Sequence, residues 1–177
     1  MGIKRGILIG RMQPPHNGHL EIIKQSFEDI DELIIGIGSS QMSHSQSNPF
    51  TAGERVLMLK KALSEQKIPG DSYYLIPIPD IMKNSVWVSH VENLCPKFNV
   101  VYSGNPLIQR LFKEKNYNVE IPPLIDRKNL SGRDIRFKML NNENWEEFVP
   151  KSVLKTINKI DGVNRLKEIS SKEINEI

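Results

Sequence analysis

Short apolar runs alternate along this chain with longer segments in which apolar residues recur every three or four positions. The clearest runs cover residues 7–9, 33–37, 73–78 and 100–102, and a weaker one covers residues 117–121. Runs this short and continuous are typical of strands that are buried on both faces of a parallel sheet. The pattern therefore predicts five parallel strands.

The segments between these runs carry helix signals. One amphipathic face is spaced by three and four residues: Leu20, Ile23, Phe27 and Ile30. Thr51 and Glu54 form a capping box, and Asn105 places a capping residue before a proline at the first helical position. Strands that alternate with helices predict an α/β fold, a Rossmann-like, doubly wound parallel five-stranded sheet flanked by helices.

The chain has 177 residues, which suits one well-packed domain. Short helical patterns continue after Arg136, around apolar residues such as Trp145 and Ile157. We expect a single domain over residues 1–177, with a core of about 4–140 and a small C-terminal helical extension of about 141–170.

The segment after the first run, residues 10–19 (GRMQPPHNGH), has the form of a strand end, a tight loop and a helix N-terminus. Such a terminus presents unpaired N–H groups and a partial positive charge, so it favours an anion. His16 and His19 share one helical face and can converge on one phosphate group, and Arg11 adds a planar cation. A structural alternative is that one histidine is a capping or core residue and the other is solvated.

Other polar residues follow the later strands, at the edge where doubly wound sheets bind ligands. They are Ser39 after the second strand, Asp80 after the third and Gly104 after the fourth. The loop of residues 39–49 is long for an α/β connection, and it is interpreted either as a lid or as an ordinary surface loop.

A second motif covers residues 130–136 (LSGRDIR). Ser131 suits the N-cap of a helix, with Asp134 at the third helical position in a variant of the capping box. The helix that begins there offers a second N-terminus for an anion and holds Arg136 close to it. Capping alone is the alternative, and it is compatible with phosphate binding.

Composition narrows the class of protein. Charged residues make up 25% of the chain and hydrophobic residues 38%, no apolar run approaches the roughly 20 residues that span a bilayer, and the N-terminus lacks the apolar core of a signal peptide. We therefore expect a cytoplasmic protein without a membrane partner. The net charge of +3 comes from cations that are dispersed among acids, which argues against nucleic-acid binding.

The segment of residues 10–19 and the motif of residues 130–136 both resemble motifs of the nucleotidyltransferase superfamily. Residues 48–55 (NPFTAGER), 84–88 (NSVWV) and 102–106 (YSGNP) are similar to the archaeal-type nicotinamide-nucleotide adenylyltransferases in particular, and the resemblance runs from about residue 4 to about residue 166. One departure is Arg133, which stands where the family usually has threonine.

The resemblance implies an enzyme that joins NMN and ATP to give NAD and pyrophosphate by direct in-line attack of the NMN phosphate on the ATP α-phosphorus. It also implies Mg²⁺ that is carried on the ATP phosphates, with no protein ligands, and a homo-oligomer. Because both reactants are anions, positioned cations can supply much of the rate. The expected catalytic residues are Arg11, His16, His19 and Arg136. The expected substrate-binding residues are Gly10, Met12, Ser39, Asp80, Ile81, Asn84, Trp87, Gly104, Asn105, Ser131 and Arg133.

Several roles stay open in the sequence. Trp87 can stack on a cationic pyridinium ring while Asn84 binds its carboxamide, or Trp87 can be a core residue. Asp80 can reach a hydrated Mg²⁺ or a ribose hydroxyl, or it can serve only as a turn residue. Two other functions also remain: a transferase for another phosphate acceptor (phosphopantetheine, a flavin or glycerol phosphate), or a non-catalytic nucleotide sensor.

Overall fold

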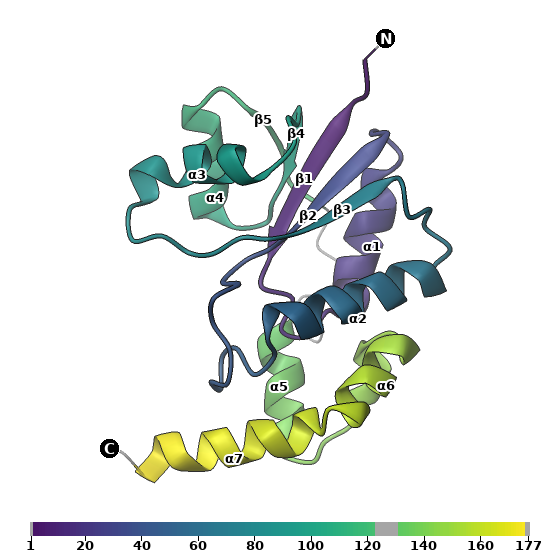
Figure 1. Ribbon diagram of the computed structural model, residues 1–177, viewed down its shortest axis with the longest axis vertical. Coiled ribbons are helices and arrows are strands. Elements are labelled where there is room, and N and C mark those ends of the chain that lie inside the picture. The colour runs from purple at the N-terminus through teal and green to yellow at the C-terminus, as the bar shows by residue number, and fades with distance from the viewer. Residues whose placement is uncertain (1, 123–130, 176–177) are drawn as a thin grey trace.

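A parallel sheet of five strands forms the centre of the computed structural model, which describes residues 2–122 and 131–175. The strand order is β3-β2-β1-β4-β5, and every neighbouring pair is parallel (Figure 1). The strands are β1 (Arg5–Gly10), β2 (Glu32–Ile37), β3 (Tyr73–Pro77), β4 (Val100–Tyr102) and β5 (Asn118–Glu120). All five predicted strands are present, and the Rossmann-like fold class is confirmed.

Helices lie on both faces of this sheet and beyond the carboxyl ends of its strands (Figure 1). They are α1 (Asn17–Ser26), α2 (Ala52–Glu65), α3 (Trp87–Leu94), α4 (Pro106–Glu114), α5 (Gly132–Leu140), α6 (Lys151–Lys159) and α7 (Gly162–Asn175), with short 3-10 turns η1 (Asn84–Val86) and η2 (Glu146–Phe148). Within the described ranges, no helix combines the length and apolar character needed to cross a membrane.

Alternate residues of the strands are buried on opposite faces, which explains their continuous apolar runs. Ile7 lies opposite Ile34 and Val101 in the sheet, and all three belong to a cluster with α3 and α4. Leu8 and Ile35 point to the other face and belong to the larger cluster with α1 and α2. Both faces are therefore covered, as the pattern predicts for a parallel sheet.

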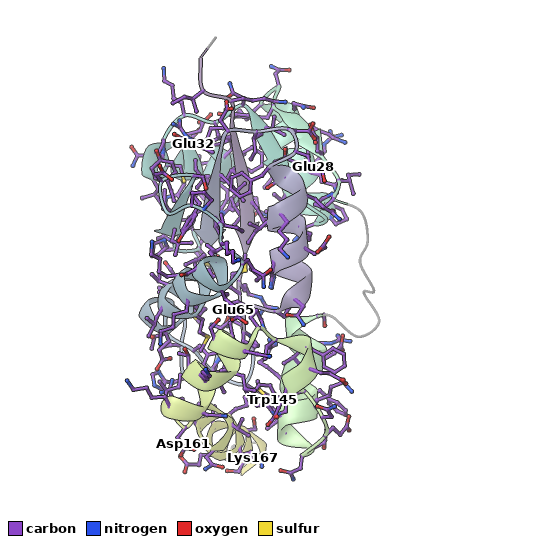
Figure 2. The ribbon with its side chains drawn as sticks, turned by 90° about the vertical axis from the view of Figure 1, so that its right-hand side faces the viewer. Glu28, Glu32, Glu65, Trp145, Asp161 and Lys167 are labelled. Carbon is purple, nitrogen blue, oxygen red and sulfur yellow. The ribbon has the colours of Figure 1, made fainter. Side chains whose placement is uncertain are left out.

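The C-terminal helices extend this larger cluster below the sheet. Trp145, 7% exposed, lies among them (Figure 2). The Glu65 carboxylate at the end of α2 accepts the Ser152 N–H in the first turn of α6 at 2.9 Å. Arg165 of α7 binds Glu54 of α2 at 2.8 Å. These bonds hold α6 and α7 against α2, and α7 in turn packs against α5.

Three local predictions need correction. Helix α1 ends at Ser26, before Phe27 and Ile30, because its last turn closes with tighter i→i+3 bonds and the Ser26 hydroxyl donates to the Ile23 carbonyl. Ser131 does cap α5, but Asp134 accepts from the Ser131 hydroxyl, and no bond to the Ser131 N–H completes a capping box. The last helix runs to Asn175, past the predicted end near residue 170.

Gly6 marks the tightest contact between β1 and its neighbours. A methyl group on Gly6 would lie 2.7 Å from the Tyr102 ring and 2.8 Å from Ile30 Cδ1. Gly6→Ala should therefore lower the free energy of unfolding by about 1 to 3 kcal/mol, the usual result of overpacking. Gly53→Ala is the matched control, because nothing lies within 4 Å there and alanine favours the helix. Urea unfolding of both variants measures this, and equal stabilities would contradict the packing argument.

Candidate functional site

A cleft of about 430 Å³ opens at the carboxyl edge of the sheet. Eight of the residues predicted to bind or act on substrate line it: Gly10, Arg11, Ser39, Asp80, Ile81, Asn84, Trp87 and Asn105. Apolar side chains of α4, Leu107 and Leu111 among them, complete the wall. The fold thus brings together residues from four strand ends, as expected for a doubly wound sheet.

Trp87 is both a core residue and part of the cleft wall. It is the first residue of α3, is only 9% exposed, and packs edge to face on Phe112 with ring centroids 5.7 Å apart. It is also part of the cleft wall, beside Asn84 in the preceding turn. One tryptophan therefore contributes both to the core and to the cleft wall.

The two histidines stack on each other at the N-terminus of α1. Their ring centroids are 3.6 Å apart, and the N–H of the N-cap residue, His16, donates to His19 Nδ1 at 3.2 Å. Because Nδ1 of His19 accepts this hydrogen bond, a neutral His19 ring carries its proton on Nε2. A methyl group built on Gly10 would lie 3.7 Å from Nε2, so this donor is beside the cleft wall.

Burial keeps both imidazoles uncharged. It lowers the pKa of His16 from 6.5 to about 4, and it lowers the pKa of His19 well below 6.5, with a further contribution from His16. Nδ1 of His16 is buried without a hydrogen-bond partner. The pair can thus offer neutral N–H donors to an anion at physiological pH.

A second pocket, here called the arginine pocket, has a volume of about 320 Å³. It is lined by Arg133 and Arg136, next to Gln46 and Ser47 of the long loop. The Arg136 side chain is 6% exposed and donates to the carbonyls of Gln13 at 2.7 Å and Gln46 at 3.0 Å. Burial, together with the charges of Arg11 and Arg133, lowers the pKa of Arg136 to about 10. Three guanidinium groups are therefore close enough to repel one another, which favours a polyanion between them.

Arg55 is a residue of the site region to which the sequence analysis gave no role. Its side chain is 0% exposed and donates to five backbone carbonyls: those of Arg11, Gly38, Ser39, Met42 and Thr51. Desolvation lowers its pKa. The sequence does contain a signal for the burial of Arg55, because this residue occupies the same helical face as the buried residues Met58, Leu59 and Ala62.

Some predicted site residues lie outside the cleft. The Met12 side chain is buried in the large hydrophobic cluster, so only its backbone, with φ 53°, can face a ligand. Gly104 is exposed after β4, and Ser131 is the N-cap of α5. Leu130, the first residue of the second motif, lies outside the described residues.

Acidic groups near the cleft are few. Asp80 is exposed there, and its N–H donates to the Gln41 side chain at 3.0 Å. In the part of the chain that the structure describes, no three His, Cys, Asp or Glu side chains are grouped to hold a metal ion.

The chain is similar to known nucleotidyltransferases. A family model described as cytidylyltransferase-like matches residues 7–138. The nicotinamide-nucleotide adenylyltransferase of Methanococcus maripaludis (strain C6) is 54% identical over 172 residues, 97% of this chain and 99% of the relative. Those of Methanococcus aeolicus and Thermoplasma volcanium are 52% identical over 169 and 167 residues, covering 96% and 94% of this chain and 96% and 93% of the relatives.

A solved structure has the same fold. It is a bifunctional NMN adenylyltransferase/ADP ribose pyrophosphatase of Francisella tularensis, complexed with AMP and a manganese ion. The TM-score is 0.80 at 21% identity, over 98% of this chain and 54% of the other. This chain therefore spans about half the length of that protein.

The buried His16 ring predicts a pH-dependent stability. Between pH 6.5 and about 4, the unfolded chain binds a proton at residue 16 that the folded chain excludes, so stability falls as pH falls. His16→Asn keeps an N-cap residue and should reduce the loss of unfolding free energy between pH 7 and pH 5 by about 2 kcal/mol. Urea unfolding at both pH values tests this. His44→Asn, at an exposed histidine, should keep the wild-type dependence, whereas equal dependences in all three proteins would show that His16 is not buried neutral.

Proposed function

This chain belongs to the nicotinamide-nucleotide adenylyltransferase family, and we propose that it joins NMN to ATP with the cleft and the arginine pocket as its two substrate sites. A phosphate oxygen of NMN attacks the α-phosphorus of ATP directly. The bond from that phosphorus to the oxygen bridging to the β-phosphorus breaks, and the oxygen keeps the electron pair. The products are NAD and pyrophosphate.

The observation that carries this proposal is the stacked histidine pair at the N-terminus of α1. The Nε2–H of His19 is beside Gly10 in the cleft wall, and the backbone N–H groups of the helix terminus provide a partial positive charge. A donor fixed in this way can stabilise the charge that grows on the α-phosphate oxygens in the transition state. In this role His16 positions His19, through its backbone bond and through stacking.

The cleft suits the nicotinamide nucleotide. Trp87 supplies an aromatic wall for a flat, cationic pyridinium ring, and Asn84 supplies both a donor and an acceptor for a carboxamide. Asp80 is within the same wall and can accept a hydrogen bond from a ribose hydroxyl. In this proposal the remaining contacts with the nucleotide come from other residues of the cleft wall, which are Gly10, Ser39, Ile81 and Asn105.

The arginine pocket suits the phosphates of ATP. Arg133 and Arg136 come from α5, where Ser131 caps the helix. Arg11 lines the cleft, and its charge lowers the pKa of Arg136. Planar guanidinium groups bind phosphate oxygens in pairs of hydrogen bonds. Arg133 gives this chain a third cation where its family usually has threonine, and we assign it to the β- and γ-phosphates that leave as pyrophosphate.

A divalent ion, Mg²⁺ in our proposal, offsets the negative charge of these phosphates when ATP binds. In this proposal the ATP phosphates carry the ion, without ligands from the protein. The proposal also includes a cytoplasmic homo-oligomer and a single domain over residues 1–177, with the C-terminal helices as an extension of the core.

Formation of NAD from NMN and ATP tests the proposal. The purified chain should form NAD and pyrophosphate in the presence of Mg²⁺. His19→Ala should lower turnover by roughly two to three orders of magnitude, the usual loss when one charge-stabilising donor is removed. His44→Ala, at an exposed histidine, should retain turnover. Phosphopantetheine, flavin mononucleotide and glycerol phosphate serve as alternative acceptors, and a preference for any of them over NMN would overturn the assignment.

Trp87 tests the recognition of nicotinamide. Trp87→Leu keeps an apolar side chain against Phe112 but removes the aromatic wall, so it should weaken NMN binding roughly ten-fold and leave ATP binding within two-fold. Trp145→Leu is the matched control, because Trp145 is equally buried but belongs to the C-terminal cluster. Calorimetric titration of each nucleotide measures both effects. If the two variants lose stability but bind NMN equally well, Trp87 is a core residue only.

A further inference from the structure

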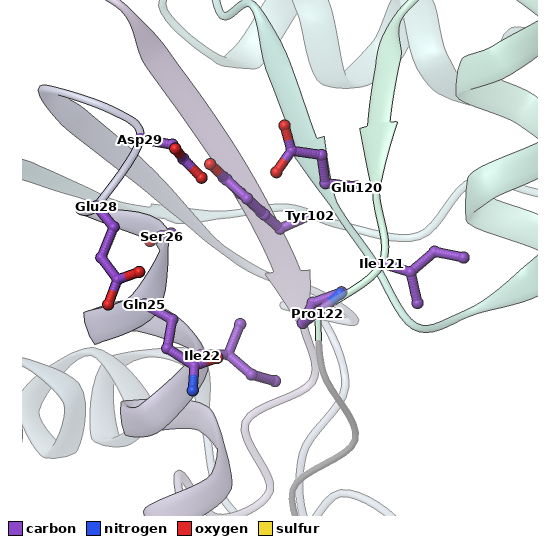
Figure 3. A pocket seen from close by; sticks show the side chains of 9 residues that line it. All are labelled: Ile22, Gln25, Ser26, Glu28, Asp29, Tyr102, Glu120, Ile121 and Pro122. Carbon is purple, nitrogen blue, oxygen red and sulfur yellow. The ribbon is translucent and has the colours of Figure 1, made fainter.

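A further pocket, here called the acidic pocket and about 360 Å³ in volume, lies on the α1 side of the sheet, away from the cleft. It is bounded by the second half of α1 and by the carboxyl ends of β4 and β5 (Figure 3). Tyr102 faces this side, as part of the cluster with α1, whereas its neighbour Val101 faces α3 and α4. The proposed reaction uses no side chain of this pocket.

Hydrogen-bond acceptors and negative charge dominate its lining. Glu28, Asp29 and Glu120 contribute carboxylates, and no lysine, arginine or histidine among the described residues lines the pocket. The Gln25 side-chain oxygen is buried there without a partner. An anion is therefore disfavoured, and a cation with several N–H donors is favoured.

The Tyr102 hydroxyl is an independent indication that something binds here. The Tyr102 side chain is only 5% exposed, and its hydroxyl has no hydrogen-bond partner. Figure 3 shows this hydroxyl on the side of the pocket where the Asp29 and Glu120 carboxylates lie. Burial and the charges of Glu120 and Asp29 raise the pKa of Tyr102 to about 12, so the hydroxyl is protonated. A buried polar group without a partner is uncommon and unfavourable, and a ligand that bonds to it removes this cost.

The arrangement of the carboxylates selects the kind of cation. A divalent ion needs several ligands at one point, and no three acidic side chains are grouped in that way among the described residues. An elongated cation can instead meet separated carboxylates in succession. Ile22, Ile121 and Pro122 add apolar surface to the same lining, which suits a methylene chain.

We propose that this pocket binds an alkyl polyamine, with its ammonium groups on the carboxylates and the Tyr102 hydroxyl and its methylene groups on the apolar residues. The charges match, because a triamine carries about as many positive groups as the pocket has carboxylates. Binding is non-covalent and requires neither NMN nor ATP, so it is measured without any assay of the transferase.

The experiment is calorimetric titration of the purified chain with spermidine at low ionic strength, in the absence of nucleotides. The wild type should bind one spermidine saturably, and Mg²⁺ at the same total charge should not compete effectively. Tyr102→Phe should weaken binding about ten-fold, the usual value of one hydrogen bond to a charged group. It should not lower thermal stability, because the lost oxygen has no partner. Glu120→Gln should weaken binding as well.

Two matched variants serve as controls. Tyr117→Phe removes a hydroxyl that donates to Glu92 at 2.7 Å, outside the pocket, and Glu114→Gln removes a carboxylate that pairs with Arg110. Both should bind spermidine as the wild type does. The absence of saturable binding would overturn the proposal, as would equal losses in Tyr102→Phe and Tyr117→Phe or full displacement by Mg²⁺.

Discussion

The geometry of the site depends on the buried guanidinium of Arg55. It has no exposed surface and donates to the carbonyls of Arg11, Gly38 and Ser39, which all line the cleft. A cation in an apolar interior is tolerated only where its donors find acceptors. The carbonyls at the ends of β1 and β2 must therefore stay turned towards Arg55. This holds the cleft wall in place through backbone bonds and preorganises it for a ligand.

The same region gathers cations that destabilise the empty protein. Arg11, Arg133 and Arg136 make no ion pair with a carboxylate among the described residues, and their mutual repulsion contributes to the low pKa of Arg136. The hydrophobic clusters offset this repulsion. Ile135 and Met139 anchor α5 in the larger cluster, together with Val153 and Leu166 of the following helices. Packing of the C-terminal helices against α5 thus offsets the repulsion between the arginines.

Sequence patterns predicted what depends on local chemistry. Continuous apolar runs identified four strands, the weaker run of residues 117–121 identified β5, and Thr51 and Asn105 identified helix starts. The features that the sequence did not predict depend on contacts between distant segments, or on local side-chain bonds that compete with the helix. The early end of α1 follows from a side-chain bond of Ser26 that competes with the helix, and the partners of Arg55 come from segments 13 to 44 positions away, apart from the local bond to Thr51. Spacing placed His16 and His19 on one face, but it could not reveal their burial or the acceptor role of His19 Nδ1.

The end of β4 is shared by the two faces of the sheet. Tyr102 points into the acidic pocket, and three residues later Asn105 caps α4 and lines the cleft. Between them, the Ser103 N–H donates to the Glu120 carbonyl at 3.1 Å, and the Asn105 N–H donates to the Ser103 hydroxyl at 3.1 Å. These bonds connect a residue of the pocket to a residue of the cleft through few rotatable groups. The two sites therefore share one backbone connection, although their side chains face opposite ways.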